Sequence, residues 1–262
     1  MATLVFFHAH PDDESIGTGG TIAKSVAAGH RVVLVTATGG EQGEYPDGFL
    51  GEGQELGEAR ADELAAAAGI LGVARVEPLG YRDSGMVGTP ENDVPECFWQ
   101  ADVEEAAVKL AAILREESAE VLVVYDENGV YGHPDHVQVH RVGVRAAEIA
   151  AVSRVFETTV NRTAWRRRMT ELAVAEGAEA QATPTIDFPI GVEEDELSHA
   201  IDVSEFIDVK RKAMRAHASQ ITDESWFMKM SDEDFAAGFG TEWFRLRGAP
   251  GGTRKADLLA DA

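Results

Sequence analysis

Two short stretches of this chain concentrate histidine and carboxylate side chains. The first runs from His8 to Glu14 and reads His-Ala-His-Pro-Asp-Asp-Glu; the second runs from Tyr131 to His136 and reads Tyr-Gly-His-Pro-Asp-His. Five of the 8 histidines fall in or just after these stretches: His8, His10, His133, His136 and His140. Imidazoles and carboxylates packed together would repel and desolvate one another unless a cation lay among them. We interpret the cation as a divalent metal.

The spacing of these residues suits a catalytic metal site. Such a site takes three protein ligands from His, Asp or Glu and keeps one position open for water. His10 and Asp13 lie three apart around Pro11, so a curled loop can turn both toward one point, and the second stretch can add a histidine. Asp12 would then face the water as general base, because a metal lowers the pKa of bound water to about 7. Zinc suits these ligands, although Fe²⁺ or Mn²⁺ would also be accepted.

Each of these residues also has an ordinary structural interpretation. Asp12, Asp13 or Ser15 could cap the N-terminus of a helix, and His10 could be buried and bonded to backbone. We expect His8, which alternates with His10 along a strand, to be structural. His140 lies one turn after His136 and could be a further ligand, but we expect it to support the site or to lie on a helix surface.

Buried strands and amphipathic helices must position the two stretches. Apolar runs precede both stretches and helical patterns follow them, which places both at the carboxyl ends of strands, where open α/β sheets bind ligands. The alternation predicts an α/β, Rossmann-like, mostly parallel sheet with helices on both faces. The expected strands are 3–8, 31–37, 74–79, 121–125 and 154–160. The expected helices are 15–28, 54–71, 102–118, 137–151, 161–178 and 203–221.

The alternation weakens after residue 181, and no repeat or linker divides the chain. We therefore expect one domain over 1–262, with a core of about 1–160 and a C-terminal extension of about 180–262. The Gly- and Glu-rich loop 38–53 suits either a mobile lid or a surface loop, and the residues do not distinguish the two.

Composition narrows the class of protein. There are 46 acidic and 23 basic residues, a net charge of −23, which argues against nucleic acid or an anionic membrane as partner. The single cysteine, Cys97, fits a reducing compartment, and neither a secretory signal nor a membrane-length apolar run is apparent. We expect a cytoplasmic protein. The residues do not distinguish a monomer from a homo-oligomer.

The segments Ala9–Glu14 and His133–His136 resemble the two signatures of the PIG-L/LmbE family of metal-dependent de-N-acetylases. The resemblance covers about the first 160 residues and includes the loop 39–44 and the segment 81–86. Within the family, the chain is similar to the mycothiol-pathway members, an N-acetylglucosaminyl-inositol deacetylase and a mycothiol conjugate amidase. The resemblance implies a Rossmann-like fold and a zinc ion held by His10, Asp13 and His136.

The resemblance also implies roles in catalysis. Asp12 would be the general base, and a protonated His133 would stabilise the oxyanion or protonate the leaving amine. Asp135 would orient a histidine of its own group. Tyr131 would be an extra oxyanion donor, with packing as the alternative.

Substrate contacts are implied less specifically. Arg60 and Asp83 match positions that contact sugar hydroxyls in similar enzymes, although the two could equally form a surface ion pair. Glu44 lies in the candidate lid, and its role is open. The late helix carries Lys210, Arg211, His217 and Gln220, in a region that closes over the substrate in relatives but is not assigned here.

We therefore expect a hydrolase that removes an acetyl or other acyl group from the amide of an N-acetylglucosaminyl conjugate. An amidase acting on a bulkier thiol conjugate or natural-product intermediate is the alternative. A non-catalytic binding module on the same fold is a further alternative of a different class. A nucleotide-binding module is disfavoured, because Gly17, Gly19 and Gly20 lack the G-x-G-x-x-G spacing.

Overall fold

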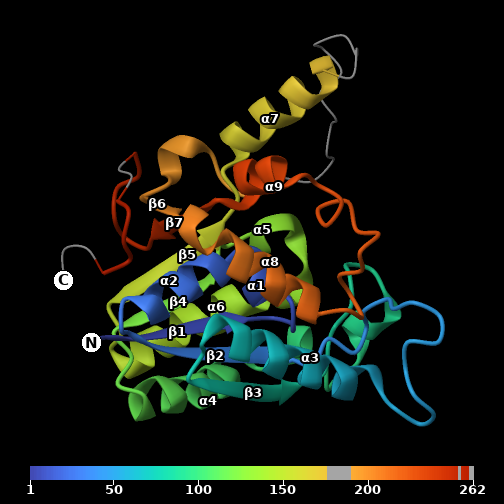
Figure 1. Ribbon diagram of the computed structural model, residues 1–262. Helices are drawn as coiled ribbons and strands as arrows, with labels where there is room; N and C mark the ends of the chain where they lie inside the picture. Colours follow the sequence, from blue (N-terminus) through green and yellow to red (C-terminus); the bar gives the residue numbers. More distant parts are fainter. Residues whose placement is uncertain (176–189, 253–254, 260–262) are drawn as a thin grey trace.

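A single seven-stranded sheet forms the centre of the molecule (Figure 1), a computed structural model that describes residues 1–175, 190–252 and 255–259. The strand order is β3-β2-β1-β4-β5-β7-β6. The first five strands run parallel, and β7 is antiparallel to both β5 and β6. The predicted α/β fold with a mostly parallel sheet is confirmed. The strands are β1 Thr3–His8, β2 Arg31–Thr38, β3 Arg75–Tyr81, β4 Val121–Tyr125, β5 Arg154–Thr159, β6 His199–Asp202 and β7 Thr241–Leu246.

Helices cover both faces of the sheet because the side chains of a strand alternate between its faces. In β1, Val5 and Phe7 pack in one core with α4 and α6, whereas Leu4 and Phe6 pack in another with α2, α3 and α8. The helices are α1 Asp13–Gly17, α2 Gly19–Ala27, α3 Leu56–Leu71, α4 Val103–Glu116, α5 Gly129–Gly132, α6 Pro134–Ala150, α7 Arg162–Ala175, α8 Ile207–Ala216 and α9 Asp232–Phe239. Short 3₁₀ turns span Pro90–Asp93, Phe98–Gln100, Glu194–Glu196 and Ser204–Phe206.

Two of the expected helices differ from those observed. The helix predicted over 15–28 is interrupted at Thr18, so that a new N-terminus begins at Gly19. The carboxylate of Glu242 caps this second start by accepting the backbone N–H groups of Gly20 and Thr21, each at 2.8 Å. The helix predicted over 203–221 is shorter, since α8 ends before His217 and a turn follows. The expected end of the helix 161–178 lies outside the described residues.

The C-terminal region belongs to the same sheet as the core. Strands β6 and β7 extend it beyond β5, and Figure 1 shows α8 lying across the same side as α2 and α3. Ile201, Ala213 and Phe244 of this region join the core formed by β1, β2 and α3. The C-terminal segment is therefore packed continuously with the part of the chain that carries both motifs.

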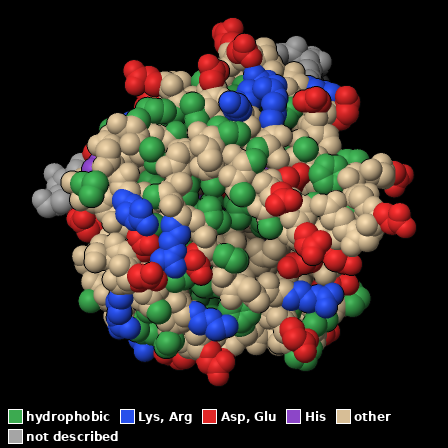
Figure 2. Space-filling model, turned by 60° about the horizontal axis from the view of Figure 1, so that its bottom comes forward, with side chains coloured by type: hydrophobic (Ala, Val, Ile, Leu, Met, Phe, Trp, Pro, Cys, Tyr) green, Lys and Arg blue, Asp and Glu red, His purple; other side chains and the backbone are tan. Residues whose placement is uncertain are grey.

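The surface carries charge of both signs. Figure 2 shows Asp and Glu side chains interspersed with Lys and Arg around one face, with hydrophobic side chains gathered nearer its centre. Within the residues that the structure describes, no helix is both long and apolar enough to span a membrane.

A buried ion pair fastens α8 to the sheet and leads to a first prediction. Lys210 Nζ lies 2.7 Å from Glu242 Oε1, and both side chains are almost fully buried. Replacing Lys210→Met leaves the Glu242 carboxylate without its cation, so we expect the free energy of unfolding to fall by about 3 kcal/mol. Urea denaturation measures this change. The double variant Lys210→Met/Glu242→Gln should recover part of the loss, and an unchanged midpoint in the single variant would show that the pair contributes nothing.

Candidate active site

Strands β1 and β4 are neighbours and run parallel, so the turns that follow them meet at one edge of the sheet. The first motif follows His8 at the end of β1, and the second lies after Tyr125 at the end of β4. Because β1 pairs with β2 on one side and β4 on the other, this edge is a switch point where a crevice can form. The fold therefore brings together two stretches that are far apart in the sequence.

The side chains predicted to hold a metal converge at this edge. Asp13 Oδ2 lies 3.3 Å from His10 Nδ1 and 3.4 Å from His136 Nε2. Donor atoms of His10, His133 and His136 also lie within 4.8 Å of one another, and all three rings are buried. The other ring nitrogen of His136, Nδ1, is buried and finds no hydrogen-bond partner in the described part of the chain. This set of imidazole nitrogens around a carboxylate oxygen fits the ligands of a zinc-type ion.

Asp135 contacts a histidine of the other motif, which differs from the expectation. Its Oδ2 accepts from His10 Nε2 at 3.2 Å and from the backbone N–H of Ser84 at 3.0 Å, while the Ser84 hydroxyl donates to its Oδ1. Asp135 is buried beside His10, whereas the His133 ring accepts the backbone N–H of residue 135. A carboxylate on the outer nitrogen of a ligand histidine fixes its tautomer and makes it more basic.

Asp83 adds a second carboxylate on the same side of His10. Its Oδ1 lies 3.5 Å from His10 Nε2 and accepts the backbone N–H of Gly85 at 2.8 Å. Burial by itself would lower the pKa of His10, but the bonds to Asp13, Asp135 and Asp83 outweigh it and raise that pKa well above its usual value. His10 is therefore surrounded by negative charge, which favours a cation bound to this ring.

Asp12, which directly precedes Asp13, has an unusual backbone conformation. Its φ is 108°, a region that residues with side chains rarely adopt. Its Oδ2 lies 3.2 Å from Arg60 Nη2. Burial raises the pKa of Asp12 to about 7, against the opposing influence of the Arg60 guanidinium. A carboxyl group that titrates near neutral pH is suited to accept a proton from water.

His133 is placed to donate a hydrogen bond from a neutral ring. Its Nδ1 accepts the backbone N–H of Asp135 at 3.1 Å and so caps α6, which leaves Nε2 as the donor. Burial, together with His10 and His136, lowers the pKa of His133 to about 3. The surroundings thus favour the neutral ring over the protonated one expected from the sequence.

Tyr131 points its hydroxyl toward the cluster and is not simply packed away. The hydroxyl oxygen lies 3.5 Å from His136 Nε2, and the side chain is 36% exposed. The turn that carries it includes Val130, whose φ of 65° is rare for a β-branched residue. The buried carboxylate of Asp126 stabilises this turn by accepting the Val130 backbone N–H at 3.0 Å. The phenol is therefore held at the rim of the site by a buried anchor.

The three residues predicted to contact the substrate differ in how far they are buried. Arg60 is only 3% exposed and donates to the carbonyl oxygens of Gly40, at 2.8 Å, and Pro11. Asp83 is only 4% exposed, so the alternative of a surface ion pair between Arg60 and Asp83 is wrong. Glu44 is exposed on the loop 38–53, where its carbonyl oxygen accepts from Gln220 Nε2 at 3.0 Å.

Two residues that the sequence analysis named without a role form a pair next to the site, and two others are found as expected. Glu14 of the first motif and His217, just after α8, are fully buried and lie 2.7 Å apart, a contact that no pattern within either segment predicts. His8 is structural, as expected, and bonds the hydroxyl groups of Tyr125 and Thr18. His140 bonds the Tyr125 carbonyl oxygen at 3.0 Å, in line with a supporting role.

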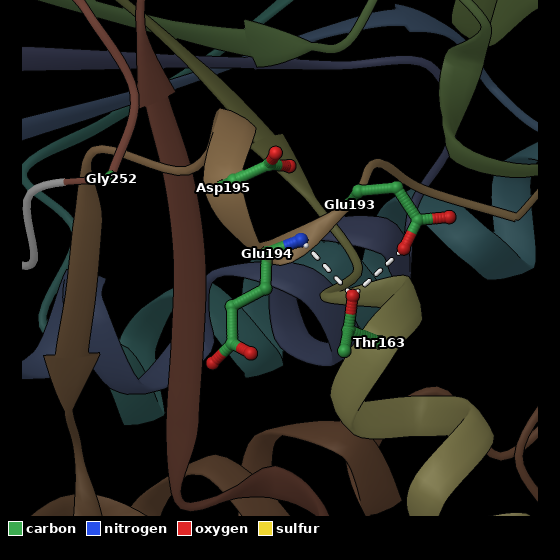
Figure 3. Close-up of a pocket in the computed structure, with 5 residues that line it drawn as sticks. All are labelled: Thr163, Glu193, Glu194, Asp195 and Gly252. Atoms are coloured by element: carbon green, nitrogen blue, oxygen red, sulfur yellow. Dashed lines mark hydrogen bonds between the residues drawn. The ribbon is translucent and has the colours of Figure 1, made fainter.

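A separate hollow of about 510 Å³ lies in the C-terminal region (Figure 3). It is lined by Thr163, Glu193, Glu194, Asp195 and Gly252, and Figure 3 shows the Thr163 hydroxyl bonded to both Glu193 and the backbone of Glu194. None of these lining residues is a histidine or belongs to either motif. Its lining therefore lacks the imidazole and carboxylate cluster of the motifs, and we place the candidate site at the motifs.

Comparisons with known proteins identify relatives of this chain. The family described as PIG-L: GlcNAc-PI de-N-acetylase matches residues 5–147. A 1D-myo-inositol 2-acetamido-2-deoxy-alpha-D-glucopyranoside deacetylase of Acidothermus cellulolyticus is 44% identical, over 99% of this chain and 95% of that protein. The deacetylase of the same name from Thermobispora bispora is 40% identical, over 98% of this chain and 92% of that protein.

Solved structures show the same fold at lower identity. An N,N'-diacetylchitobiose deacetylase from Pyrococcus horikoshii matches with a TM-score of 0.59 and 24% identity, over 93% of this chain and 83% of that one. A zinc inhibited form of teicoplanin deacetylase matches with a TM-score of 0.60 and 18% identity, over 95% of this chain and 100% of that one. With the family match and the curated relatives, these observations lead to one conclusion: the chain belongs to the GlcNAc-PI de-N-acetylase (PIG-L) family.

Proposed function

We propose that this protein is a metal-dependent deacetylase that hydrolyses the acetamide of a 2-acetamido-2-deoxy-glucopyranoside linked to inositol. Relatives of that name are 40% and 44% identical over nearly the whole chain, which supports the substrate class. The observation that carries the mechanism is the contact of one Asp13 oxygen with both His10 and His136, beside Asp12. The acidic charge balance supports action on a small conjugate rather than on nucleic acid or an anionic membrane. The single cysteine fits the reducing cytoplasm, where we place this activity.

His10, Asp13 and His136 would hold the metal, with zinc as the first candidate and Fe²⁺ or Mn²⁺ as alternatives. A metal ion bound there supplies Lewis-acid polarisation and lowers the pKa of a water molecule. His133 could replace Asp13 in this set by distance alone. We favour Asp13 because its carboxylate touches both rings, while His133 already uses one nitrogen to cap α6.

The side chains around this set divide the remaining chemistry of amide hydrolysis. Asp12 accepts a proton from the attacking water as the oxygen bonds to the carbonyl carbon. His133 Nε2 and the Tyr131 hydroxyl donate hydrogen bonds to the carbonyl oxygen as it gains negative charge. The C–N bond then breaks, and Asp12 delivers the proton it took from the water to the leaving amine, which returns Asp12 to the carboxylate form. The products are acetate and a free amino sugar.

Asp135 and the three residues predicted to contact the substrate have different roles around the proposed metal ligands and Asp12. Asp135 would orient His10 so that its inner nitrogen faces the metal. Arg60 would hold the carboxylate of Asp12, and Asp83 would act beside Asp135 on His10. Glu44, exposed on the loop, remains our candidate for contact with a sugar hydroxyl.

The general-base role of Asp12 can be tested by replacing Asp12→Asn. Asparagine tolerates a positive φ, so the backbone should be preserved while the proton acceptor is lost. We expect kcat to fall by roughly 10²- to 10⁴-fold at unchanged metal content. The assay measures the free amine released from an inositol-linked N-acetylglucosamine, with elemental analysis of the metal as control. A variant that retains its metal and wild-type turnover would exclude Asp12 as the base.

The requirement for a metal can be tested by removing it. Chelation followed by buffer exchange should abolish release of the amine, and Zn²⁺, Fe²⁺ or Mn²⁺ added in turn should restore it to different extents. The ranking identifies the most active metal. Full activity in protein that elemental analysis shows to be free of these metals would contradict the proposal.

The choice between a deacetylase and an amidase can be tested with the same metal-loaded protein. Faster hydrolysis of bulky thiol-conjugate amides than of the acetamide would favour the amidase alternative.

The role of Asp135 can be tested by replacing Asp135→Asn, which weakens the acceptor on His10. Outer partners of this kind typically contribute 10- to 100-fold to metal affinity, so we expect the dissociation constant for Zn²⁺ to rise by about that factor. Competition with a chromogenic chelator measures it. The surface variant Glu104→Gln, on α4, serves as control and should bind the metal like the wild type. Equal affinity in both variants would show that Asp135 does not act on the metal site.

A further inference from the structure

The turn that follows α8 connects the C-terminal region to three elements around Asp12. His217 Nε2 lies 2.7 Å from Glu14 Oε1 in the first motif. The backbone N–H and the hydroxyl of Ser219 each donate to the carboxylate of Glu63 at 2.7 Å. Gln220 Nε2 donates to the Glu44 carbonyl oxygen at 3.0 Å. The proposed mechanism uses neither Glu14 nor His217.

Glu14 transmits the contact with His217 directly to the backbone of Asp12. Its second oxygen, Oε2, accepts the Asp12 backbone N–H at 3.0 Å, and the Glu14 side chain is fully buried. On the other side, the Asp12 carbonyl oxygen accepts the N–H groups of Ser15 and Ile16 at 3.0 Å each. The Asp12 peptide is thus bonded on both sides, which its φ of 108° requires, because surrounding structure must hold a residue in such a conformation.

The same turn also contacts α3, the helix that carries Arg60. Glu63, which Ser219 binds, lies three residues after Arg60 on α3, so both project from the same face of that helix. Arg60 contacts the Asp12 carboxylate. The turn is therefore bonded both to the first motif, through Glu14, and to the helix that carries Arg60.

We propose that His217 is a positioning residue that acts through Glu14 to hold Asp12 in the orientation needed to accept a proton. The proposal rests on the proposed function, since it takes Asp12 as the general base. It assigns a catalytic purpose to a C-terminal turn that has no motif of its own. The alternative is that His217 merely fastens α8 to the rest of the fold.

The nitrogen that His217 uses makes a matched pair of variants available. Only Nε2 contacts Glu14, while Nδ1 is buried and has no hydrogen-bond partner among the described residues. The amide nitrogen of glutamine can occupy the position of Nε2, whereas that of the shorter asparagine reaches only the position of Nδ1. His217→Gln should preserve the bond to Glu14 and His217→Asn should lose it, although both replace the ring with the same polar amide group.

The experiment compares kcat, KM, bound metal and melting temperature in both variants, using the metal-loaded protein and inositol-linked N-acetylglucosamine. We expect His217→Asn to lower kcat at least tenfold, with KM and metal content within twofold of wild type. His217→Gln should retain at least half of the wild-type kcat. Lys210→Met removes the other buried anchor of α8 and should lower the melting temperature but leave kcat within twofold. All assays are run well below each melting temperature.

A second comparison links the effect to Asp12. Because residues that act as a unit are not additive, His217→Asn should lower kcat no further in an Asp12→Asn background. Equal kcat in the Gln and Asn variants, or an undiminished effect in that background, would overturn the proposal. If His217→Asn does not fold, a His217→Gln variant with less than a tenth of wild-type kcat overturns it as well. Absence of deacetylation by the wild type refutes the proposed function instead, so the two failures are distinguishable.

Discussion

The parallel pairing of β1 with β4 is the constraint on which the site depends. Leu4 lies beside Val121 and Phe6 beside Val123, so the two strands end at the same edge of the sheet. β4 is buried along its whole length and β1 from Leu4 onward, and the polar residues of the motifs gather where these strands end. The contacts of Asp13 with His136 and of Asp135 with His10 both cross from one motif to the other. Separating the strands would therefore separate the motifs.

Two buried carboxylates at this edge of the sheet, those of Asp135 and Glu14, are hydrogen-bonded to neighbouring side chains. Asp135 accepts bonds from His10 and from both donors of Ser84, and Glu14 is paired with His217. A buried carboxylate without such partners would be costly, whereas one that is fully bonded holds its neighbours rigidly. The same bonds that make the acidic cluster tolerable thus fix the orientation of the side chains that would bind a metal and a substrate. Stability and preorganisation of the site have one physical origin here.

The C-terminal region completes the sheet and contacts the first motif through His217. The family match covers residues 5–147, but relatives of about 40% identity extend over nearly the whole chain, consistent with a role for the later residues. Strands β6 and β7 were not predicted. β6 has only four residues, and in β7 the inward position of Glu242 breaks the apolar alternation that marks a strand. That glutamate is buried because Lys210 and two backbone N–H groups bind it, which only the folded chain can supply.

The sequence by itself determined the five parallel strands, their flanking helices and the two motifs that meet at their ends. These features are encoded locally, in apolar runs of strand length and in dense groups of histidine and carboxylate residues. Only the tertiary structure decided that Asp135 bonds His10, that burial lowers the pKa of His133, that Arg60 is buried and that His217 contacts Glu14 of the first motif. Each of these depends on which distant side chain faces which atom and on how far water is excluded. Such properties arise from packing between elements, and no periodicity within a single segment records them.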